Sequence, residues 1–292
     1  MKIAYGYDIE IECANETPVI ALVDIHPTRR GDICRNDIPV IRSLSFPDRD
    51  ISSELYQDKF GNLCRRFVAP AGRLSLCASG LISDSGMPDG CDTDAAMVRI
   101  EDLPSDVLEF TLGSRYCETD ILSEQAWARF GRPDLGWWTV QAICDYVHDH
   151  ITFDYLQARS TRSAAEGLRE RIGVCRDFAH LAITLCRCLN IPARYCTGYL
   201  GDIGVPADPN PMDFSAWFEA YLDGRWWTFD ARHNQPRIGR IVIARGRDAT
   251  DVPILNSYGP HVLRRFDILT QEMASNADVP PSPLMNTFVQ LS

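Results

Sequence analysis

The chain has little of what marks several common protein classes. Only 29 of its 292 residues are Lys or Arg, against 40 Asp and Glu, which gives a formal net charge of −11. Phosphate recognition needs a clustered excess of basic side chains. The composition therefore argues against a nucleic acid or an anionic membrane surface as the main partner. The sequence also contains no run of about 18–20 apolar residues, which a membrane-spanning helix would need.

Targeting, disulfide and phosphate-binding signals are missing as well. The N-terminal MKIAYGYDIEIECANE alternates apolar and polar residues and has no continuous apolar core of a signal peptide. The 11 cysteines are odd in number and irregularly spaced, which is typical of free thiols in a reducing compartment. No Gly-rich phosphate loop or convincing metal-ligand spacing occurs, so we expect no cofactor and no metal. These absences predict a soluble, cytoplasmic protein.

What is present indicates an α+β chain in two parts. A hydrophobic fraction of 45% is enough for a sizeable core. Residues 1–100 contain short alternating runs broken by Gly and Pro, which predicts a β-rich, sandwich-like domain with strands near 5–13, 18–25, 63–69 and 73–78. Residues 101–270 form the predicted core domain. Residues 271–292, rich in Pro, are expected to be a flexible tail.

The core domain is predicted to place helices before strands. Helices are expected to begin at Leu103 and to occupy 119–130, 138–150, 163–171 and a segment starting at Cys175. Strands are expected at 193–200, 214–222, 225–230, 238–244 and 262–269.

Cys175 is the first candidate for chemistry, because it stands where a loop turns into a helix. Only a thiolate is a good sulfur nucleophile, and the positive end of a helix favours a thiolate at neutral pH. Apolar residues then recur at helical spacing and predict one buried face; these are Phe178, Leu181, Ala182, Leu185 and Leu189.

Two stretches carry a family resemblance: GVCRDFAHLAITLCRCLNIPARYCTGYL at 173–200 and DFSAWFEAYLDGRWWTFDARHN at 213–234. They resemble the bacterial transglutaminase-like superfamily of cysteine proteases with an N-terminal β region. The resemblance implies a papain-like core, in which the helix that carries the cysteine packs on an antiparallel sheet. It implies a Cys–His–Asp triad with the nucleophile at Cys175 and the aspartate at Asp230. It also places Trp217 beside the site as a substrate-binding residue, although ordinary core packing is the commoner role of tryptophan.

The chain departs from the family pattern at the histidine. The expected His-Ala-Trp triplet is Ser215-Ala216-Trp217 here. Cysteine acyl transfer needs an imidazole to take the thiol proton and later to protonate the leaving amine. A serine cannot titrate near neutral pH, so Ser215 can orient a water but cannot be the base.

His233 is the candidate alternative base, because it follows Asp230 by three residues. A turn at 231–232 would fold its imidazole back toward the thiol, whereas a continuing strand would point it away. Pairing with backbone in a loop is the other reading. The remaining five histidines are expected to be solvated or hydrogen-bonded structurally; they are His26, His148, His150, His180 and His261.

Three functions remain open from the residues. The first is a thiol enzyme that acts on amide or peptide carbonyls through a Cys175 thioester, with water or an amine as acceptor. The second is a catalytically impaired binding or scaffold protein of the same fold, suggested by Ser215. The third is an esterase or thioesterase, for which an acid is less necessary. We expect a peptide or protein amide partner, no nucleic acid and no membrane. A homo-oligomer formed through the β-rich part is a further expectation.

Overall fold

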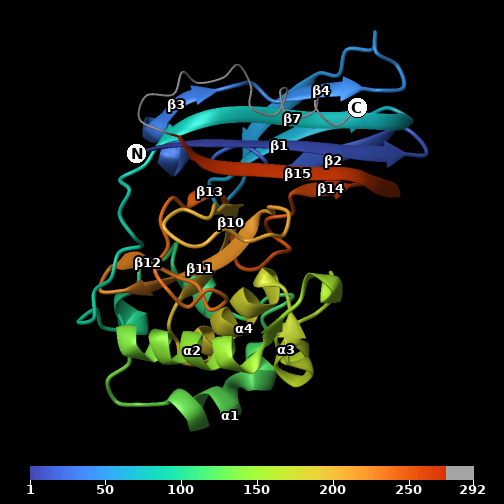
Figure 1. Ribbon diagram of the computed structural model, residues 1–292. Helices are drawn as coiled ribbons and strands as arrows, with labels where there is room; N and C mark the ends of the chain where they lie inside the picture. The colour runs from blue at the N-terminus through green and yellow to red at the C-terminus, as the bar shows by residue number, and fades with distance from the viewer. Residues whose placement is uncertain (274–292) are drawn as a thin grey trace.

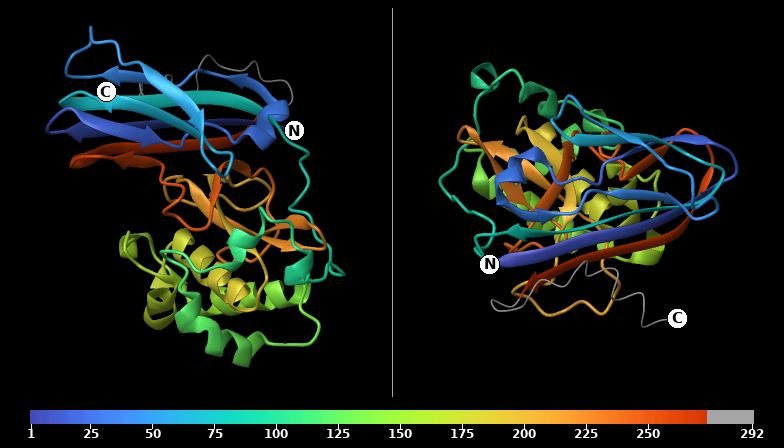
Figure 2. Two further views of the ribbon diagram at one scale, coloured as in Figure 1. Left: turned by 180° about the vertical axis from the view of Figure 1, so that it is seen from behind. Right: turned by 90° about the horizontal axis from the view of Figure 1, so that it is seen from above.

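The computed structural model describes residues 1–273 and arranges them in layers. The long strands of the β-rich part form the upper part of Figure 1, the sheet of the core domain lies in the middle, and the helices form the lower part. The view from behind in Figure 2 shows the same order. The fold is thus α+β, with helices packed on an antiparallel sheet and a separate β-rich part, as the sequence predicts. No helix within residues 1–273 is long and apolar enough to cross a membrane.

The β-rich part consists of two antiparallel sheets. The first has the order β15-β1-β7-β3, with β4 also paired to β7, and the second has the order β14-β2-β6-β5. The strands are β1 (Lys2–Cys13), β2 (Thr17–Ala21), β3 (Ile33–Asn36), β4 (Val40–Ser43), β5 (Ser53–Gln57), β6 (Leu63–Ala69), β7 (Gly72–Ser83), β14 (Leu255–Ser257) and β15 (His261–Met273). The predicted strand at 63–69 has the bounds of β6.

The C-terminal strands correct one grouping made from the sequence. The strand expected at 262–269 was assigned to the core domain of 101–270, but β15 pairs antiparallel with β1 along its whole length. β14 likewise pairs with β2. The chain therefore returns to the β-rich part after the core, and β15 includes 271–273 of the expected tail. The rest of that tail, 274–292, lies outside the described residues.

The core sheet has the order β12-β11-β10-β13, and all three of its pairings are antiparallel. Its strands are β10 (Ala193–Tyr199), β11 (Ser215–Leu222), β12 (Arg225–Phe229) and β13 (Ile241–Gly246). The helices are α1 (Thr119–Phe130), α2 (Trp137–His150), α3 (Ala164–Glu170) and α4 (Cys175–Cys188). A short parallel pair, β8 (Thr152–Phe153) with β9 (Ile172–Gly173), leads the chain into α4. Where a helix was expected to begin at Leu103, short 3-10 turns occur instead at Ile100–Asp102 and Leu108–Thr111.

Helix α4 lies at the centre of the core domain. It packs on β10 and β11 and contacts the other three helices. Nearly all of its residues are buried, far more than the one apolar face expected from the sequence. Its buried polar groups therefore need partners. The Arg187 guanidinium, for example, donates to the carbonyl oxygens of Ala193, Leu112 and Arg247.

Candidate functional site

Cys175 is the first residue of α4, as the sequence predicts. The Asp177 carboxylate accepts a hydrogen bond from the backbone N–H of Val174 at 2.9 Å and from Arg162 at 2.9 Å. A capping contact of this kind contributes about 1 kcal/mol to a helix. A Cβ at Gly173 would lie 2.6 Å from the Asp177 carboxylate, so only glycine fits there. The helix start that presents the thiol is therefore firmly fixed.

The Cys175 thiol is protonated at neutral pH, which corrects the expectation of a thiolate. Burial raises the pKa of Cys175 to about 11, and the Asp213 carboxylate adds to this effect. Arg232 and the backbone N–H of Ala216 act in the opposite direction. Burial and negative charge together outweigh the helix N-terminus, so the thiol needs a base.

The thiol lies in a cleft with a volume of about 510 Å³. One wall is apolar and comes from two parts of the chain, the segment 252–255 and Phe266 of β15. The cleft is also lined by Arg159 and Arg176. Since Leu255 and Phe266 belong to strands of the β-rich part, both parts of the molecule form the cleft.

Asp230 follows β12 directly, and its side chain is 3% exposed. One carboxylate oxygen accepts hydrogen bonds from the backbone N–H groups of Arg232 at 3.0 Å and His233 at 3.1 Å. The other lies 2.8 Å from Nδ1 of His233 and 2.9 Å from the Arg240 guanidinium. Burial alone would raise the pKa of Asp230, but Arg240 and His233 hold it well below its usual value. Asp230 is therefore a carboxylate, and Nδ1 of His233 donates to it.

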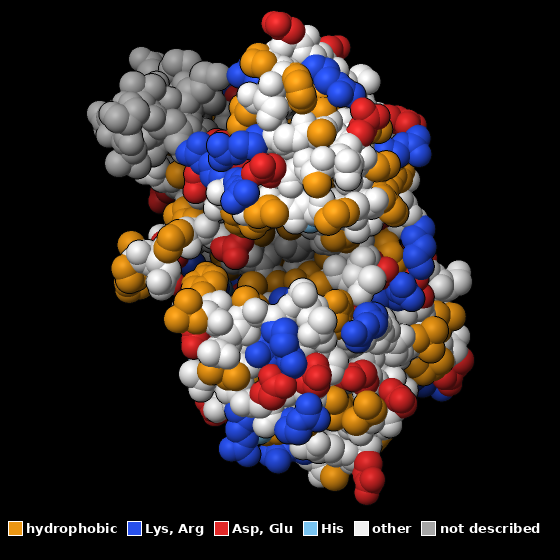
Figure 3. All heavy atoms as spheres, turned by 90° about the vertical axis from the view of Figure 1, so that its right-hand side faces the viewer, with side chains coloured by type: hydrophobic (Ala, Val, Ile, Leu, Met, Phe, Trp, Pro, Cys, Tyr) orange, Lys and Arg blue, Asp and Glu red, His pale blue; other side chains and the backbone are white. Residues whose placement is uncertain are grey.

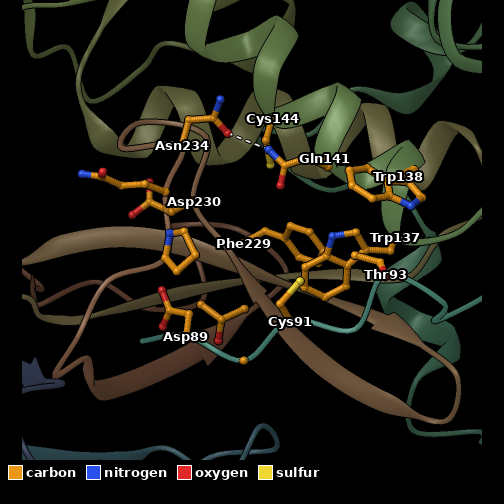
Figure 4. Close-up of a pocket in the computed structure, with 14 residues that line it drawn as sticks. Asp89, Cys91, Thr93, Trp137, Trp138, Gln141, Cys144, Phe229, Asp230 and Asn234 are labelled. Carbon is orange, nitrogen blue, oxygen red and sulfur yellow. Dashed lines mark hydrogen bonds between the residues drawn. The ribbon is translucent and has the colours of Figure 1, made fainter. Parts of the chain in front are cut away.

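The turn that carries His233 is fixed by α2. Nδ1 of His148 lies 2.9 Å from the Arg232 carbonyl oxygen. Asn234, with a φ of 50°, accepts from Gln141 at 2.9 Å and donates to Asp145 at 2.8 Å. Figure 4 shows the Asn234–Gln141 bond at the edge of a cavity of about 220 Å³ beside Asp230. Cys175 does not line this cavity, so it is separate from the thiol cleft.

Two further charged residues support Asp230: Arg240, which binds it directly, and Asp89, which binds Arg240. Arg240 binds Asp230 and, through Nε, both oxygens of Asp89 at 3.1 and 2.9 Å. Asp89 also accepts from the backbone N–H of Arg237. The signal for such pairs in the sequence is a run of four arginines at 237, 240, 245 and 247 in an acidic chain. Their particular partners are set by long-range packing.

Ser215 begins β11 and lines a small cavity of about 40 Å³ together with His233 and Asp213. Asp213 also lines the thiol cleft, so the two cavities adjoin. Within residues 1–273, no side-chain hydrogen bond joins the Cys175 sulfur to Ser215 or His233. The structure thus brings His233 to Asp230 and both near Ser215, and leaves the thiol without a side-chain hydrogen-bond partner.

Trp217 does not lie in the thiol cleft, which corrects its assignment as a substrate-binding residue. Side chains alternate along a strand, and Ala216 is the neighbour that faces the thiol. Trp217 is 2% exposed and packs with Cys196 and Val242. The Arg240 guanidinium lies 5.1 Å from the centre of its ring.

The five other histidines all have hydrogen-bonding neighbours away from the thiol. His180 shows how this happens: its Nε2 accepts from the backbone N–H of Ala249 at 3.1 Å, and its ring stacks on Tyr116. Burial lowers the pKa of His180 to about 3, so it stays neutral. His26 lies within hydrogen-bonding distance of Thr28, and His148 of Arg232. His150 lies within that distance of Leu168, and His261 of Ser257.

All 11 cysteines, which lie between positions 13 and 196, are free thiols. Within residues 1–273 no group of three or more His, Cys, Asp or Glu side chains is arranged to hold a metal ion.

Known proteins share both the core and the whole architecture. A family model described as the transglutaminase-like superfamily matches residues 138–231, from α2 to just past Asp230. The crystal structure of a putative cysteine protease from Cytophaga hutchinsonii is similar with a TM-score of 0.79 and 30% identity, covering 96% of this chain and 93% of that one.

Mycobacterial proteins are also similar. An uncharacterized protein of Mycobacterium tuberculosis is 31% identical over 223 residues, which are 68% of this chain and 69% of the relative. An uncharacterized protein of Mycobacterium leprae is 30% identical over 116 residues, so the match spans only 40% of that relative. The helix-borne cysteine, the antiparallel sheet and these matches define a thiol-enzyme fold. The chain belongs to the transglutaminase-like superfamily.

Proposed function

We propose that the protein is a thiol acyl-transfer enzyme in which Cys175 attacks an amide or peptide carbonyl and His233, held by Asp230, acts as the base. The observation that carries the proposal is the 2.8 Å contact between Nδ1 of His233 and Asp230. Because the carboxylate fixes the proton on Nδ1, Nε2 of the neutral ring keeps a lone pair, as a general base requires.

Formation of the thioester proceeds by two proton transfers. Nε2 of His233 takes the thiol proton as the Cys175 sulfur bonds to the carbonyl carbon. The resulting oxyanion is stabilised by the backbone N–H of Cys175 at the start of α4. The imidazolium then protonates the leaving amine as the carbon–nitrogen bond breaks and the thioester forms. Water or a second amine then attacks the thioester carbonyl and gives a proton to Nε2 of His233. As the carbon–sulfur bond breaks, the imidazolium returns that proton to the Cys175 sulfur, which completes hydrolysis or transamidation.

The raised pKa of Cys175 makes this base necessary. A thiol with a pKa of about 11 is almost entirely protonated at pH 7. His233 lines the cavity that adjoins the thiol cleft, whereas none of the other five histidines lines either cavity. Within the described residues, His233 is thus the histidine best placed to replace the one absent at position 215.

The test is turnover of a fluorogenic peptide amide by the wild type and His233→Ala, with intact-protein mass spectrometry to detect the Cys175 thioester. We expect the variant to lose activity by a factor of about 10²–10⁴, the usual contribution of a general base. His148→Ala is the matched control, although it also contacts the turn. Its activity should fall less than that of His233→Ala. Equal acylation in wild type and His233→Ala would refute the role of His233.

A binding or scaffold protein is the second candidate, because Ser215 replaces the expected histidine and the thiol has no side-chain hydrogen-bond partner in residues 1–273. Under this reading the cleft binds peptides without turning them over. Binding of a peptide amide with no thioester and no product in the wild type would favour it.

A further inference from the structure

Three charged side chains line the thiol cleft: Arg159, Arg176 and Asp213. Arg159 is paired with Glu166 and Glu170, at 3.1 and 2.9 Å. Arg176 lies 3.5 Å from Asp177 and donates to backbone carbonyl oxygens. Both cations of the cleft are therefore already compensated.

Asp213 differs from the two arginines because its carboxylate forms no ion pair with any residue in 1–273. Desolvation raises the pKa of Asp213, while the backbone N–H of Phe214, which donates to its carboxylate, and the charge of Arg232 lower it. Other acidic residues of the same segment have partners. Asp202 lies 3.7 Å from Arg237, and Asp208 accepts from Asn210. The segment thus leaves one carboxylate without an ion pair beside Cys175.

The charge of Arg232 lowers the pKa of Asp213, but Arg232 forms no ion pair with Asp213 and stacks on aromatic rings instead. Its guanidinium carbon lies 3.8 Å from the centre of the Phe153 ring and 5.9 Å from that of Tyr155. Stacking of this kind holds a guanidinium in place without neutralising a carboxylate. A ligand can therefore supply the missing positive charge.

The surroundings of Asp213 fit an alkyl chain that ends in a positive charge. Phe214 and Phe266 meet edge to face at 5.8 Å, and both line the cleft. Figure 3 shows the molecule hollowed between its upper and lower parts, with hydrophobic side chains around the hollow. An aliphatic stem would pack against these rings, while its charged end would reach the carboxylate.

We propose that Asp213 recognises an ammonium or guanidinium group of the substrate and so makes the thiol cleft selective for cationic peptides. This inference rests on the proposed function of Cys175 and names its substrate class.

Such recognition would also activate the nucleophile. Asp213 raises the pKa of Cys175, Asp230 raises it to a smaller extent, and Arg232 lowers it. The titratable groups Tyr155 and Tyr195 adjoin the same thiol. Both are phenols whose pKa is raised, so they stay neutral at the pH 7 of the experiment. Neutralising Asp213 with a bound cation should lower the pKa of the thiol and increase the thiolate fraction.

The experiment measures alkylation of Cys175 by iodoacetamide at pH 7 in the full-length protein, followed at that residue by peptide mass spectrometry. The probe is n-pentylammonium, and n-pentanol is the neutral control with the same chain. In the wild type the rate should rise saturably with n-pentylammonium, by about threefold for each tenfold gain in thiolate, because a more acidic thiolate is less nucleophilic.

Asp213→Asn removes the charge and keeps the shape of the side chain. We expect it to label faster than the wild type without amine and to ignore n-pentylammonium. Asp208→Asn is the matched control, because Asp208 is acidic and exposed but does not line the thiol cleft; it should respond like the wild type.

Equal effects of n-pentylammonium and n-pentanol, or an unchanged amine response in Asp213→Asn, would overturn the proposal. Alkylation requires no acyl transfer, so the outcome is independent of whether peptide amides are turned over. A protein that fails the turnover assay can still pass this one, and the reverse also holds.

Discussion

Asp230 and Cys175 belong to the same candidate site, yet their surroundings differ greatly. The Asp230 carboxylate receives four hydrogen bonds, from two backbone N–H groups, from His233 and from Arg240. The Cys175 sulfur has no side-chain hydrogen-bond partner in residues 1–273, and the Ala216 N–H and the charge of Arg232 lower its pKa only in part. The Asp230 end of the site is held in place by hydrogen bonds, and the Cys175 thiol is not.

This difference indicates that Asp230 and Cys175 have different roles in the proposed reaction. A buried carboxylate with several charge-assisted hydrogen bonds fixes the orientation and tautomer of its histidine in advance. A protonated thiol in an open cleft becomes reactive only when a base and a ligand approach it. In the function that we propose, a His233–Asp230 pair held by hydrogen bonds lies beside a thiol that the substrate activates.

Removing the thiol should have the largest effect. Cys175→Ala is expected to reduce turnover of a peptide amide to background, a loss of about 10³-fold or more, because covalent catalysis has no substitute nucleophile. The measurement is product formation under saturating substrate. Cys91→Ala, which removes an exposed cysteine outside the cleft, should retain full activity. Activity that persists in Cys175→Ala would place the chemistry elsewhere.

Moving the histidine from position 233 to position 215 tests the role of the His233–Asp230 pair. If His233 supplies the base, a histidine at the family position should replace it, so Ser215→His should restore about 10²-fold of the turnover that His233→Ala loses. In a wild-type background, Ser215→His should change turnover by less than about tenfold. A large gain in the wild-type background would instead show that the protein lacks a base and would support the scaffold function.

The ion pair behind Asp230 should contribute mainly to stability. Arg240 is 7% exposed on its side chain and binds both Asp230 and Asp89. Arg240→Gln leaves the buried Asp230 carboxylate and the half-buried Asp89 carboxylate without this cation and should cost about 3–5 kcal/mol in the free energy of urea unfolding. Arg264→Gln is the control, because Arg264 pairs with Glu12 at the surface and should cost no more than about 1 kcal/mol. Equal losses in the two variants would mean that the buried pair is dispensable.

The pH dependence of stability gives the smallest expected effect. The pKa of Asp230 is lower in the folded state than its unfolded value of about 3.9. Its charge therefore stabilises the fold fully above that value, and this contribution is lost as the pH falls through the folded pKa. The stability gap between wild type and Asp230→Asn should shrink by on the order of 1–3 kcal/mol between pH 5 and pH 2. A gap that stays constant would show that the charge of Asp230 is not what stabilises the turn.

The elements of the core could largely be predicted from the sequence, because their apolar spacing is local. The helix at 119–130 and the start of α4 at Cys175 follow from periodicity and from the residues at their ends. The pairing of β15 with β1 could not be predicted, since it joins residues that are far apart in the sequence, such as Lys2 and Met273. The local pattern shows a strand but not its partner.

The candidate site divides in the same way. Asp230 follows from the motif, and the contact with His233 required a turn that the sequence left open. The position of Trp217 depended on which face of β11 meets α4. The state of the Cys175 thiol depended on burial and on Asp213, and both arise from packing.

The most direct test of the account is the pH dependence of single-turnover acylation of Cys175 by an activated peptide ester, in wild type and in His233→Gln. With His233 as the base, the wild-type rate should level off far below the thiol pKa of about 11, while the rate of His233→Gln should keep rising toward pH 11. If the wild-type rate rises up to pH 11 in parallel with that of the variant, His233 does not take the thiol proton and the central claim is wrong.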